Sequence, residues 1–391
     1  MKIRSVGLFF FFSILFAMPV SIVQAEEKSP IELTAESGVL MEASTGKILF
    51  EKDGDVQKPP ASVTKIMTLL LIFEDLAGGK LSLDENVTVS SYAASMGGSQ
   101  VFLEEGEVQN VDTLIKCIAV ASANDGCVAM AEHLNGSETA FVDRMNKKAK
   151  ELGMGNTHFV NCCGLDAQGH VTTAKDIAIM SKELTTKYPD VFQYSSIWMD
   201  EFTHKTAKGE SVFGLSNTNK LIKNYPGCNG LKTGSTSKAK FCLSATATRN
   251  DISLIAVVMG CPDSKSRSKD VSKMFDYGFA NVSVYEDTDP LEGWKTVEIR
   301  SGEEKSVPIH SEENFRYIML KEEEEKEVRK NVKILEEIKA PIKENEILGE
   351  IDYLLDEEVI GTVPIYASKE MKKKTYLYSL KKLWNQVMLD T

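Results

Sequence analysis

Residues 62–81, SVTKIMTLLLIFEDLAGGKL, constrain the fold most, because they predict a helix with apolar residues on nearly every face. Two consecutive glycines, Gly78 and Gly79, predict where this helix ends. A helix without a polar face has to be covered on all sides, so we expect it in the middle of a domain. The rest of the chain must therefore supply the elements that surround it.

The surrounding elements alternate between hairpins and helices. Two short strands are predicted on either side of residues 44–46, and two longer strand-like runs on either side of residues 249–251. Helical patterns cover residues 112–134 in two pieces, residues 138–152 and residues 266–279. Hairpins combined with helices in this way indicate an antiparallel sheet flanked by helices, which is the α+β class.

The last third of the chain has a different composition. Residues 284–366 are rich in Glu and Lys and contain short β-like runs but no long amphipathic helix, so they predict a small all-β domain. Residues 367–391 predict a C-terminal amphipathic helix with Trp384 on its apolar face and many lysines elsewhere. This pattern is typical of a helix that lies on an anionic membrane surface. A helix that docks on its own protein is the alternative.

The first 25 residues predict a signal peptide. Two basic residues precede an apolar run that Pro19 interrupts, and a small-x-small ending at Ala25 follows. An uncleaved anchor is the alternative. We expect cleavage after Ala25, export from the cytoplasm, and peripheral attachment to the outer face of the cytoplasmic membrane. Residues 26–283 then form the first folded domain.

Charge and composition exclude several classes of function. The net charge of −12 argues against a general affinity for nucleic acid. The seven cysteines include no CxxC pair and the five histidines show no ligand spacing, so we expect no metal site and no cofactor. An odd number of cysteines cannot all pair within one chain, and most of them are expected to be small buried apolar residues.

Ser62 and Lys65 lie at the start of the central helix. The pattern S-x-x-K is weak alone and occurs six times, but only the copy at Ser62 begins a buried apolar helix. The i, i+3 spacing places both side chains on one face of that helix. A positive charge is costly away from water, so a buried lysine can act as general base toward a neighbouring hydroxyl. The backbone N–H of Ser62, at the positive end of the helix, is also suited to bind an oxyanion.

Two further motifs each occur once. S-x-N, from Ser122 to Asn124, falls between two helical pieces, where a turn or capping role is the alternative. K-T-G, residues 232–234, is predicted to open a strand. Gly234 would let a substrate backbone come close to that strand, and Lys232 offers a fixed positive charge.

In this order, the three motifs resemble those of penicillin-binding proteins and serine β-lactamases. Longer stretches, such as ELGMGNTHFVNCCGLDAQGH and GLKTGSTSKAKFCLSATA, resemble the low-molecular-mass D-alanyl-D-alanine carboxypeptidases. The ending APIKENEILGEIDYLLDEEVIGTVPIYA does so too, so the resemblance covers nearly the whole chain after the predicted signal peptide. The stretch STSKAKFCLSATA is most similar to the sporulation-associated subgroup of Gram-positive enzymes. The resemblance implies a penicillin-binding-protein/serine β-lactamase-like catalytic domain.

The resemblance also implies catalytic roles. Ser62 corresponds to the acylated nucleophile and Lys65 to its general base. Ser122 corresponds to the residue that relays a proton to the leaving amine. Asn124 corresponds to the residue that binds the peptide part of the substrate or orients Lys65.

Substrate binding is assigned in the same way. Lys232 and Thr233 correspond to the residues that receive the terminal carboxylate of the substrate, next to Gly234. The backbone N–H groups of Ser62 and Ser235 correspond to the oxyanion hole. His170 matches a recurring position of the family, and we expect a structural role for it.

The resemblance implies an enzyme that removes the terminal D-alanine from peptidoglycan pentapeptides through a seryl acyl-enzyme, with β-lactams as inhibitors. A serine β-lactamase is one alternative, but the stretch EHLN at 132–135 does not match a deacylating glutamate loop. A catalytically idle, wall-associated scaffold is the other alternative, and the three intact motifs argue against it.

Overall fold

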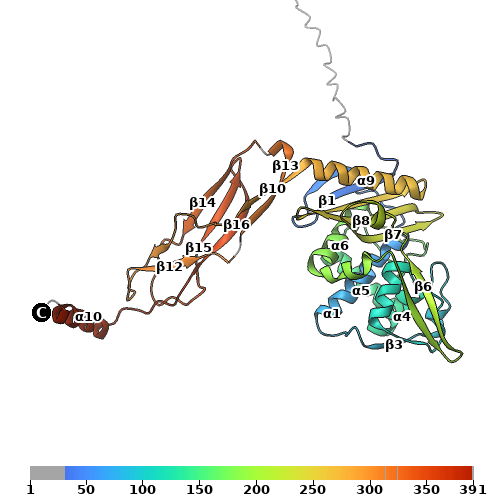
Figure 1. The fold of residues 1–391 in the computed structure, drawn as a ribbon, viewed down its shortest axis with the longest axis horizontal. Helices are drawn as coiled ribbons and strands as arrows, with labels where there is room; N and C mark the ends of the chain where they lie inside the picture. Colours follow the sequence, from blue (N-terminus) through green and yellow to red (C-terminus); the bar gives the residue numbers. More distant parts are fainter. Residues whose placement is uncertain (1–30, 313, 324, 390–391) are drawn as a thin grey trace, which may run out of the picture. The chain divides into compact units, whose positions relative to one another are not determined.

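The structure is a computed structural model, and it describes residues 31–389 except 313 and 324. The predicted signal peptide, residues 1–25, lies outside the described residues. Within these residues the chain forms an α+β part up to residue 281, then an all-β part, and then one helix (Figure 1). The predicted fold class is confirmed.

A five-stranded antiparallel sheet forms the centre of the α+β part, in the order β2-β1-β9-β8-β7. Its strands are β1 (Ser37–Glu42), β2 (Ile48–Lys52), β7 (Cys228–Thr236), β8 (Lys240–Arg249) and β9 (Ile252–Cys261). Strands β1 and β9 pair along their length, with Val39 opposite Val257. Both predicted hairpins are present, and this pairing joins them into one sheet although more than 180 residues separate them.

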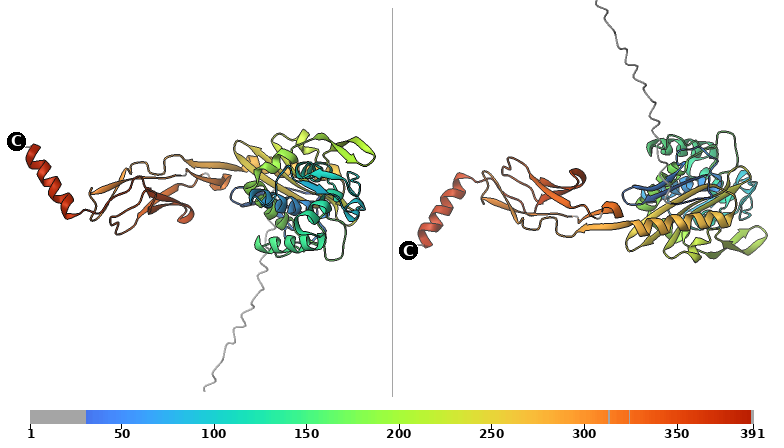
Figure 2. Two further views of the ribbon diagram at one scale, coloured as in Figure 1. Left: turned by 90° about the horizontal axis from the view of Figure 1, so that it is seen from below. Right: turned by 90° about the horizontal axis from the view of Figure 1, so that it is seen from above.

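Helices cover both faces of this sheet (Figures 1 and 2). Helix α9 (Ser264–Asn281) packs on β8 and β9, and helix α6 (Ala174–Lys187) packs on β1 and β9 from the other face. Helix α1 (Lys65–Ala77) packs against α6 and also contacts α4 (Asn124–Asn135) and α5 (Glu138–Glu151). All side chains of α1 from Lys65 to Phe73 are buried. The uniformly apolar helix therefore lies where its pattern predicts.

The predicted helices at 112–134, 138–152 and 266–279 are present. The first is split as expected, because α3 (Val111–Lys116) and a π-helical turn (Cys117–Ala121) precede α4. Helix α6 and the hairpin of β5 (Met199–Thr206) and β6 (Gly209–Ser216) are not predicted from the sequence pattern. The shorter elements of this part are η1 (Ala61–Thr64), β3 (Asn86–Thr88), α2 (Ser91–Ala94), β4 (Val108–Asn110), η3 (Pro189–Val191), α7 (Phe192–Ser195) and α8 (Leu221–Asn224).

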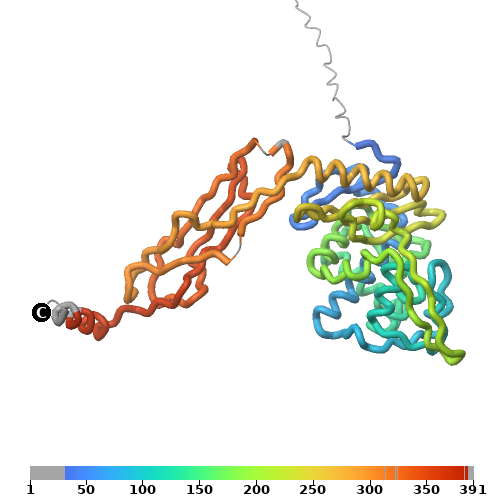
Figure 3. Tube along the Cα trace, in the orientation of Figure 1, coloured from blue at the N-terminus to red at the C-terminus, as the bar shows by residue number. Residues whose placement is uncertain are grey.

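The all-β part follows α9 directly, as the trace in Figure 3 shows. One sheet has the order β11-β12-β16-β15-β14, and a second pairs β10 with β13. Tyr353 is fully buried in its core and stacks on Phe315 with ring centroids 3.6 Å apart. The strands are β10 (Val282–Asp287), β11 (Thr296–Glu298), β12 (Ser306–His310), β13 (Phe315–Leu320), β14 (Val328–Ile334), β15 (Ile347–Leu355) and β16 (Glu358–Ala367), with a short 3-10 turn η4 (Lys321–Glu323).

The terminal helix α10 (Tyr376–Leu389) begins later than the predicted residue 367. Ala367 still belongs to β16, and Met371 is buried and bridges to Ile342. These backbone pairings keep the chain extended until about Lys374, so the predicted start of the helix is wrong by about nine residues. Among the described helices, none is long and apolar enough to span a bilayer.

Candidate active site

Ser62 lies in the 3-10 turn η1, directly before α1, and two glycines make room for this turn. A Cβ atom at Gly164 would lie 1.9 Å from the Ala61 carbonyl oxygen, and one at Gly234 would lie 2.9 Å from the Ser62 nitrogen. Any larger residue at either position would therefore push the turn out of place. This explains Gly234 of the K-T-G motif structurally, and it adds Gly164, which the motifs do not predict.

Lys65 is completely buried, and its Nζ atom has three oxygen partners. It donates to Cys163 O at 2.6 Å and to Asn124 Oδ1 at 2.7 Å, and it lies 3.2 Å from Ser62 Oγ. Cys163 O is a backbone carbonyl oxygen and cannot donate to the amine. Asn124 Oδ1 cannot donate either, because the bond from Nδ2 to Gly97 O fixes the amide with its oxygen toward Lys65. The predicted neighbourhood of Ser62, Lys65 and Asn124 is present.

These contacts define what the amine can do chemically. A neutral amine has two hydrogens and one lone pair. Cys163 O and Asn124 Oδ1 can take the two hydrogens, and the lone pair then points to the remaining partner, the Ser62 hydroxyl. The geometry is that of a general base and its nucleophile within hydrogen-bond reach.

Ser122 and Asn124 close the site from the α4 side. Ser122 has a left-handed backbone with φ of 62°, and among the described residues its buried hydroxyl has no hydrogen-bond partner. Buried polar groups are rarely unpaired, so this hydroxyl is available to a bound molecule. Asn124 uses both ends of its amide, because Oδ1 accepts from Lys65 while Nδ2 donates to Gly97 O at 2.7 Å.

Strand β7 carries the cationic side of the site. The K-T-G motif lies in the second half of this strand, which starts at Cys228, so the prediction that the motif opens a strand is wrong. Lys232 is 2% exposed, and within the described part of the chain its ammonium donates to the Thr233 carbonyl oxygen at 3.2 Å. Burial, together with the nearby Lys65, lowers the pKa of Lys232 to about 7. A buried cation without a carboxylate partner suits an anionic ligand.

Thr233 and Ser235 follow Lys232 along the same strand. The hydroxyl of Thr233 contacts that of Thr218, which follows the unpredicted β5–β6 hairpin. Ser235 is exposed near the C-terminal end of β7, where it pairs with Phe241 of β8. All eight predicted site residues thus come from η1, α1, the start of α4, the turn before it and β7.

His170 supports the turn that holds Ser62. Val160 N–H donates to its Nδ1 atom at 2.9 Å, so the ring proton resides on Nε2, which lies 2.9 Å from Thr64 Oγ1. Thr64 in turn donates to Ala61 O. Burial lowers the pKa of His170 to about 4, and His158 adds to the effect. This neutral histidine has the structural role that the sequence predicts.

Acid should destabilise the fold through His170. The folded pKa of about 4 lies below the ordinary value of 6.5, so the unfolded chain binds the proton first as the pH falls from 6.5 to 4. We expect the free energy of unfolding to fall by about 3 kcal/mol over this range. His170→Asn keeps an acceptor for Val160 N–H and should flatten this dependence in urea unfolding at pH 7 and 4.5. Equal pH dependence in both proteins would contradict the assignment.

Two features of the site carry no motif signal. The carbonyl of Cys163 is the shortest contact of Lys65, but a backbone acceptor can come from any residue type. Its neighbour Gly164 is recognisable only as a glycine in the stretch NCCGLDAQGH.

All seven cysteines are free and buried, which confirms their prediction as small core residues. Among the described residues, no group of three or more His, Cys, Asp or Glu side chains could hold a metal ion.

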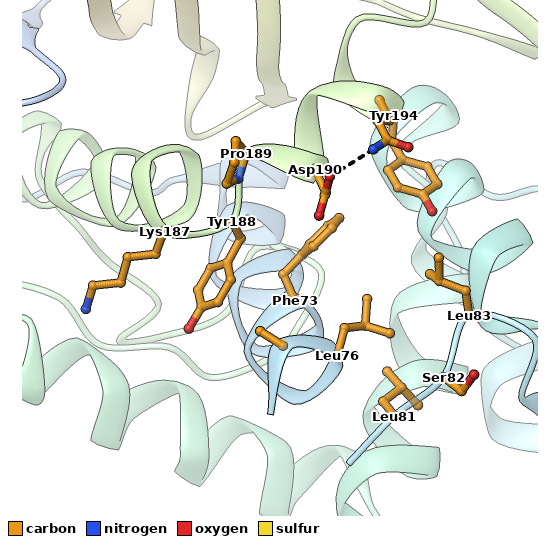
Figure 4. A pocket seen from close by; sticks show the side chains of 12 residues that line it. Phe73, Leu76, Leu81, Ser82, Leu83, Lys187, Tyr188, Pro189, Asp190 and Tyr194 are labelled. Carbon is orange, nitrogen blue, oxygen red and sulfur yellow. Dashed lines mark hydrogen bonds between the residues drawn. The ribbon is translucent and has the colours of Figure 1, made fainter. Parts of the chain in front are cut away.

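A separate cavity of about 540 Å³ lies at the far end of α1 from Ser62 (Figure 4). Apolar and aromatic side chains such as Phe73, Tyr188 and Tyr194 line it, with Lys187 and Asp190 near them. Ser82 and Lys187 both line it, but they lie on opposite sides of the cavity in Figure 4, and the Ser82 hydroxyl donates to Asp84 instead. It is not the candidate active site.

Comparisons with known proteins agree with this geometry. The family model described as D-alanyl-D-alanine carboxypeptidase matches residues 23–263, and that of the penicillin-binding protein 5 C-terminal domain matches residues 279–373. The chain is 41% identical over 366 residues to the D-alanyl-D-alanine carboxypeptidase DacF of Bacillus subtilis, which covers 93% of both chains. It is 31% identical over 355 residues to DacA of Escherichia coli, which covers 88% of this chain and 85% of DacA.

A solved structure, penicillin binding protein 5 from Haemophilus influenzae, is similar with a TM-score of 0.70 and 28% identity, over 88% of this chain and 100% of that one. These findings support the predicted carboxypeptidase over a β-lactamase and over an idle scaffold. With the three motifs gathered around one buried lysine, the chain belongs to the D-alanyl-D-alanine carboxypeptidase family of hydrolases.

Proposed function

We propose that Ser62 is the residue that becomes acylated and that Lys65 is its general base. Lys65 takes the hydroxyl proton, and Ser62 Oγ attacks the carbonyl carbon between the two terminal D-alanines of a stem pentapeptide. The backbone N–H groups of Ser62 and Ser235 hold the resulting oxyanion. The observation that carries this proposal is the position of Lys65 Nζ, 3.2 Å from Ser62 Oγ with two fixed acceptors on its other side.

The leaving group and the second half-reaction follow from the remaining residues. When the C–N bond breaks, Ser122 passes a proton to the nitrogen of the departing D-alanine, and Ser62 stays joined to the tetrapeptide as an ester. Water then hydrolyses the ester, with Lys65 as base, and restores the free hydroxyl. Lys232 and Thr233 hold the substrate carboxylate, and Asn124 holds Lys65 and the peptide part of the substrate.

Mass spectrometry of muropeptides after digestion by the purified protein tests this function. Pentapeptides should become tetrapeptides with release of one D-alanine each. Rapid hydrolysis of nitrocefin, without D-alanine release from diacetyl-Lys-D-Ala-D-Ala, would instead favour a β-lactamase. A β-lactam should acylate the same serine, because its ring amide mimics the scissile peptide bond.

We also propose that α10 attaches the exported protein to an anionic membrane surface. The apolar side chains of Tyr376, Leu377, Leu380 and Trp384 are 81%, 79%, 47% and 68% exposed, which argues against a helix docked on its own protein. Exposed lysines, among them Lys381 and Lys382, accompany this face. An exposed apolar face with Trp and lysines suits the boundary between lipid headgroups and acyl chains. The signal peptide predicted at residues 1–25 supports export, and the stretch STSKAKFCLSATA supports a role in sporulation.

Deletion of residues 375–391 should abolish sedimentation with vesicles that contain anionic lipid. The cut is placed after Lys374 because Met371 is part of the β-domain core and has to stay. The double variant K381A/K382A should weaken binding about 30-fold at low salt, since each lysine near the surface contributes about 1 kcal/mol. Full sedimentation of the truncated protein would contradict this attachment.

A further inference from the structure

Phe102 combines two properties that are unusual for a large apolar residue. Its side chain is 60% exposed, and its backbone has a φ of 62°, in the left-handed region. Glycine adopts this conformation without strain, whereas a bulky residue does so only where its surroundings enforce it. The same segment does use glycine at Gly98, where φ is 83° and a Cβ would lie 2.8 Å from Asn124 Nδ2. At position 102 the chain keeps an exposed ring despite the strain.

Asp125 enforces this backbone conformation. Its carboxylate is buried and accepts from the N–H groups of both neighbours of Phe102, from Val101 at 3.1 Å and from Leu103 at 3.1 Å. Val101 and Leu103 are themselves buried, so the intervening residue has to point outward. Asp125 directly follows Asn124, whose N–H donates to Ser99 O and whose side chain donates to Gly97 O. One short stretch of α4 thus holds both Lys65 and the segment that carries Phe102.

The ring of Phe102 lies edge-to-face on Phe213 of β6, with centroids 5.9 Å apart. Phe213 is in turn supported by the buried rings of Phe202 and His204. Strand β6 packs against the π-helical turn that ends directly before Ser122, and it leads to Thr218, which contacts Thr233. Phe102 therefore lies on a segment that is bonded to Asn124, and Phe213 lies on a strand that leads to Thr218 and its contact with Thr233.

We infer that Phe102, resting on Phe213, is a specificity-determining residue that binds the long side chain of the diamino acid preceding the D-alanine pair in the stem peptide. This inference rests on the proposed function. Gly97 and Ser99, which bond to Asn124, connect the site to Phe102 along the chain, so a peptide that leaves the site past Asn124 would extend toward Phe102. The methylene groups of a long amine-bearing side chain can pack on an exposed aromatic ring, and its ammonium is attracted to ring faces. Glu105, three residues beyond Phe102 and exposed, adds a negative charge beside Glu104 and Lys208, which pair with each other.

The test compares D-alanine release from two peptides, Nα-acetyl-L-Lys-D-Ala-D-Ala, whose side-chain ammonium is free, and acetyl-L-Ala-D-Ala-D-Ala. Packing about half of four methylene groups on the ring should favour the lysine peptide about tenfold in kcat/KM. Phe102→Gly removes the ring and the backbone strain together, so it should fold at least as stably as the wild type in thermal unfolding. The tenfold preference should disappear through a higher KM for the lysine peptide. Phe102→Leu should retain part of it, and Leu83→Ala, an exposed apolar residue near the far end of α1, should retain all of it.

Acylation by 6-aminopenicillanic acid separates this inference from the proposed function, because this β-lactam has no acyl side chain to reach Phe102. We expect Phe102→Gly and wild type to react with it at rates within twofold of each other. Equal kcat/KM of the wild type for both peptides, or an unchanged preference in Phe102→Gly, would overturn the role of Phe102 while leaving the proposed function intact. No acylation and no D-alanine release in the wild type would overturn the proposed function itself.

Discussion

Replacement of Lys65 by methionine should slow acylation of Ser62 by a β-lactam about 10²–10⁴-fold, the range for loss of a positioned general base. Methionine fills nearly the same volume and suits the apolar helix, so the protein should remain folded. The hydroxyl of Ser62 would stay in place but would have no group to take its proton. Stopped-flow measurement of acylation by a fluorescent penicillin provides the rate.

A lysine outside the site serves as the control. Lys175→Met removes a charge near the start of α6, where the side chain is 36% exposed and pairs with Asp55. Its acylation rate should match that of the wild type. If Lys65→Met also acylated at the wild-type rate, another group would have to activate Ser62, and the contacts of Lys65 would be structural only.

Replacement of Lys232 by methionine should have the second largest effect on activity. We expect the variant to be less active but more stable than the wild type. Removing one partner of a buried charge pair costs about 2–5 kcal/mol, so kcat/KM for peptides with a free terminal carboxylate should fall roughly 30- to 4,000-fold. Peptides whose terminal carboxylate is amidated should lose much less, because they offer no anion to Lys232. Equal losses for both kinds of peptide would contradict a carboxylate-binding role.

The folded protein without substrate should become more stable in Lys232→Met. The folded pKa of about 7 lies below the ordinary lysine value of 10.5, so the unfolded state binds more protons between pH 7 and 10.5. Stability should therefore rise with pH across this window in the wild type, and this rise should be smaller in the variant. At pH 7 the variant should gain about 0.5–2 kcal/mol in urea unfolding, as expected when a residue kept for function is replaced by an apolar one. A loss of stability would show that Lys232 has a partner in the free enzyme.

Much of this architecture could be predicted because local patterns and the final packing agree. The helix after Ser62 has no polar face, so only one environment suits it, and Lys65 is buried in that environment. The hairpin around residues 44–46 and the strands around residues 249–251 have strong turn signals between apolar runs. Ser122, Asn124 and Lys232 are found through short motifs, because the chemistry requires those side chains in that order.

Other features depend on contacts that a single sequence does not encode locally. The Cys163 carbonyl that holds Lys65 is a backbone atom, and the loop that brings it there lies almost 100 residues further along the chain. The strain at Phe102 follows from a carboxylate 23 residues away, not from the residues beside it. The start of α10 was predicted too early because the apolar residues near 371 suit a helix face as well as the β-domain core, and tertiary pairing with Ile342 decides between them.

Peptide mapping by mass spectrometry after brief exposure to benzylpenicillin tests the central assignment most directly. The wild type should carry one covalent penicilloyl group per chain, on the peptide that contains Ser62, and Ser62→Ala should carry none. An adduct on another residue, or labelling that survives in Ser62→Ala, would contradict the assignment of Ser62 as the nucleophile.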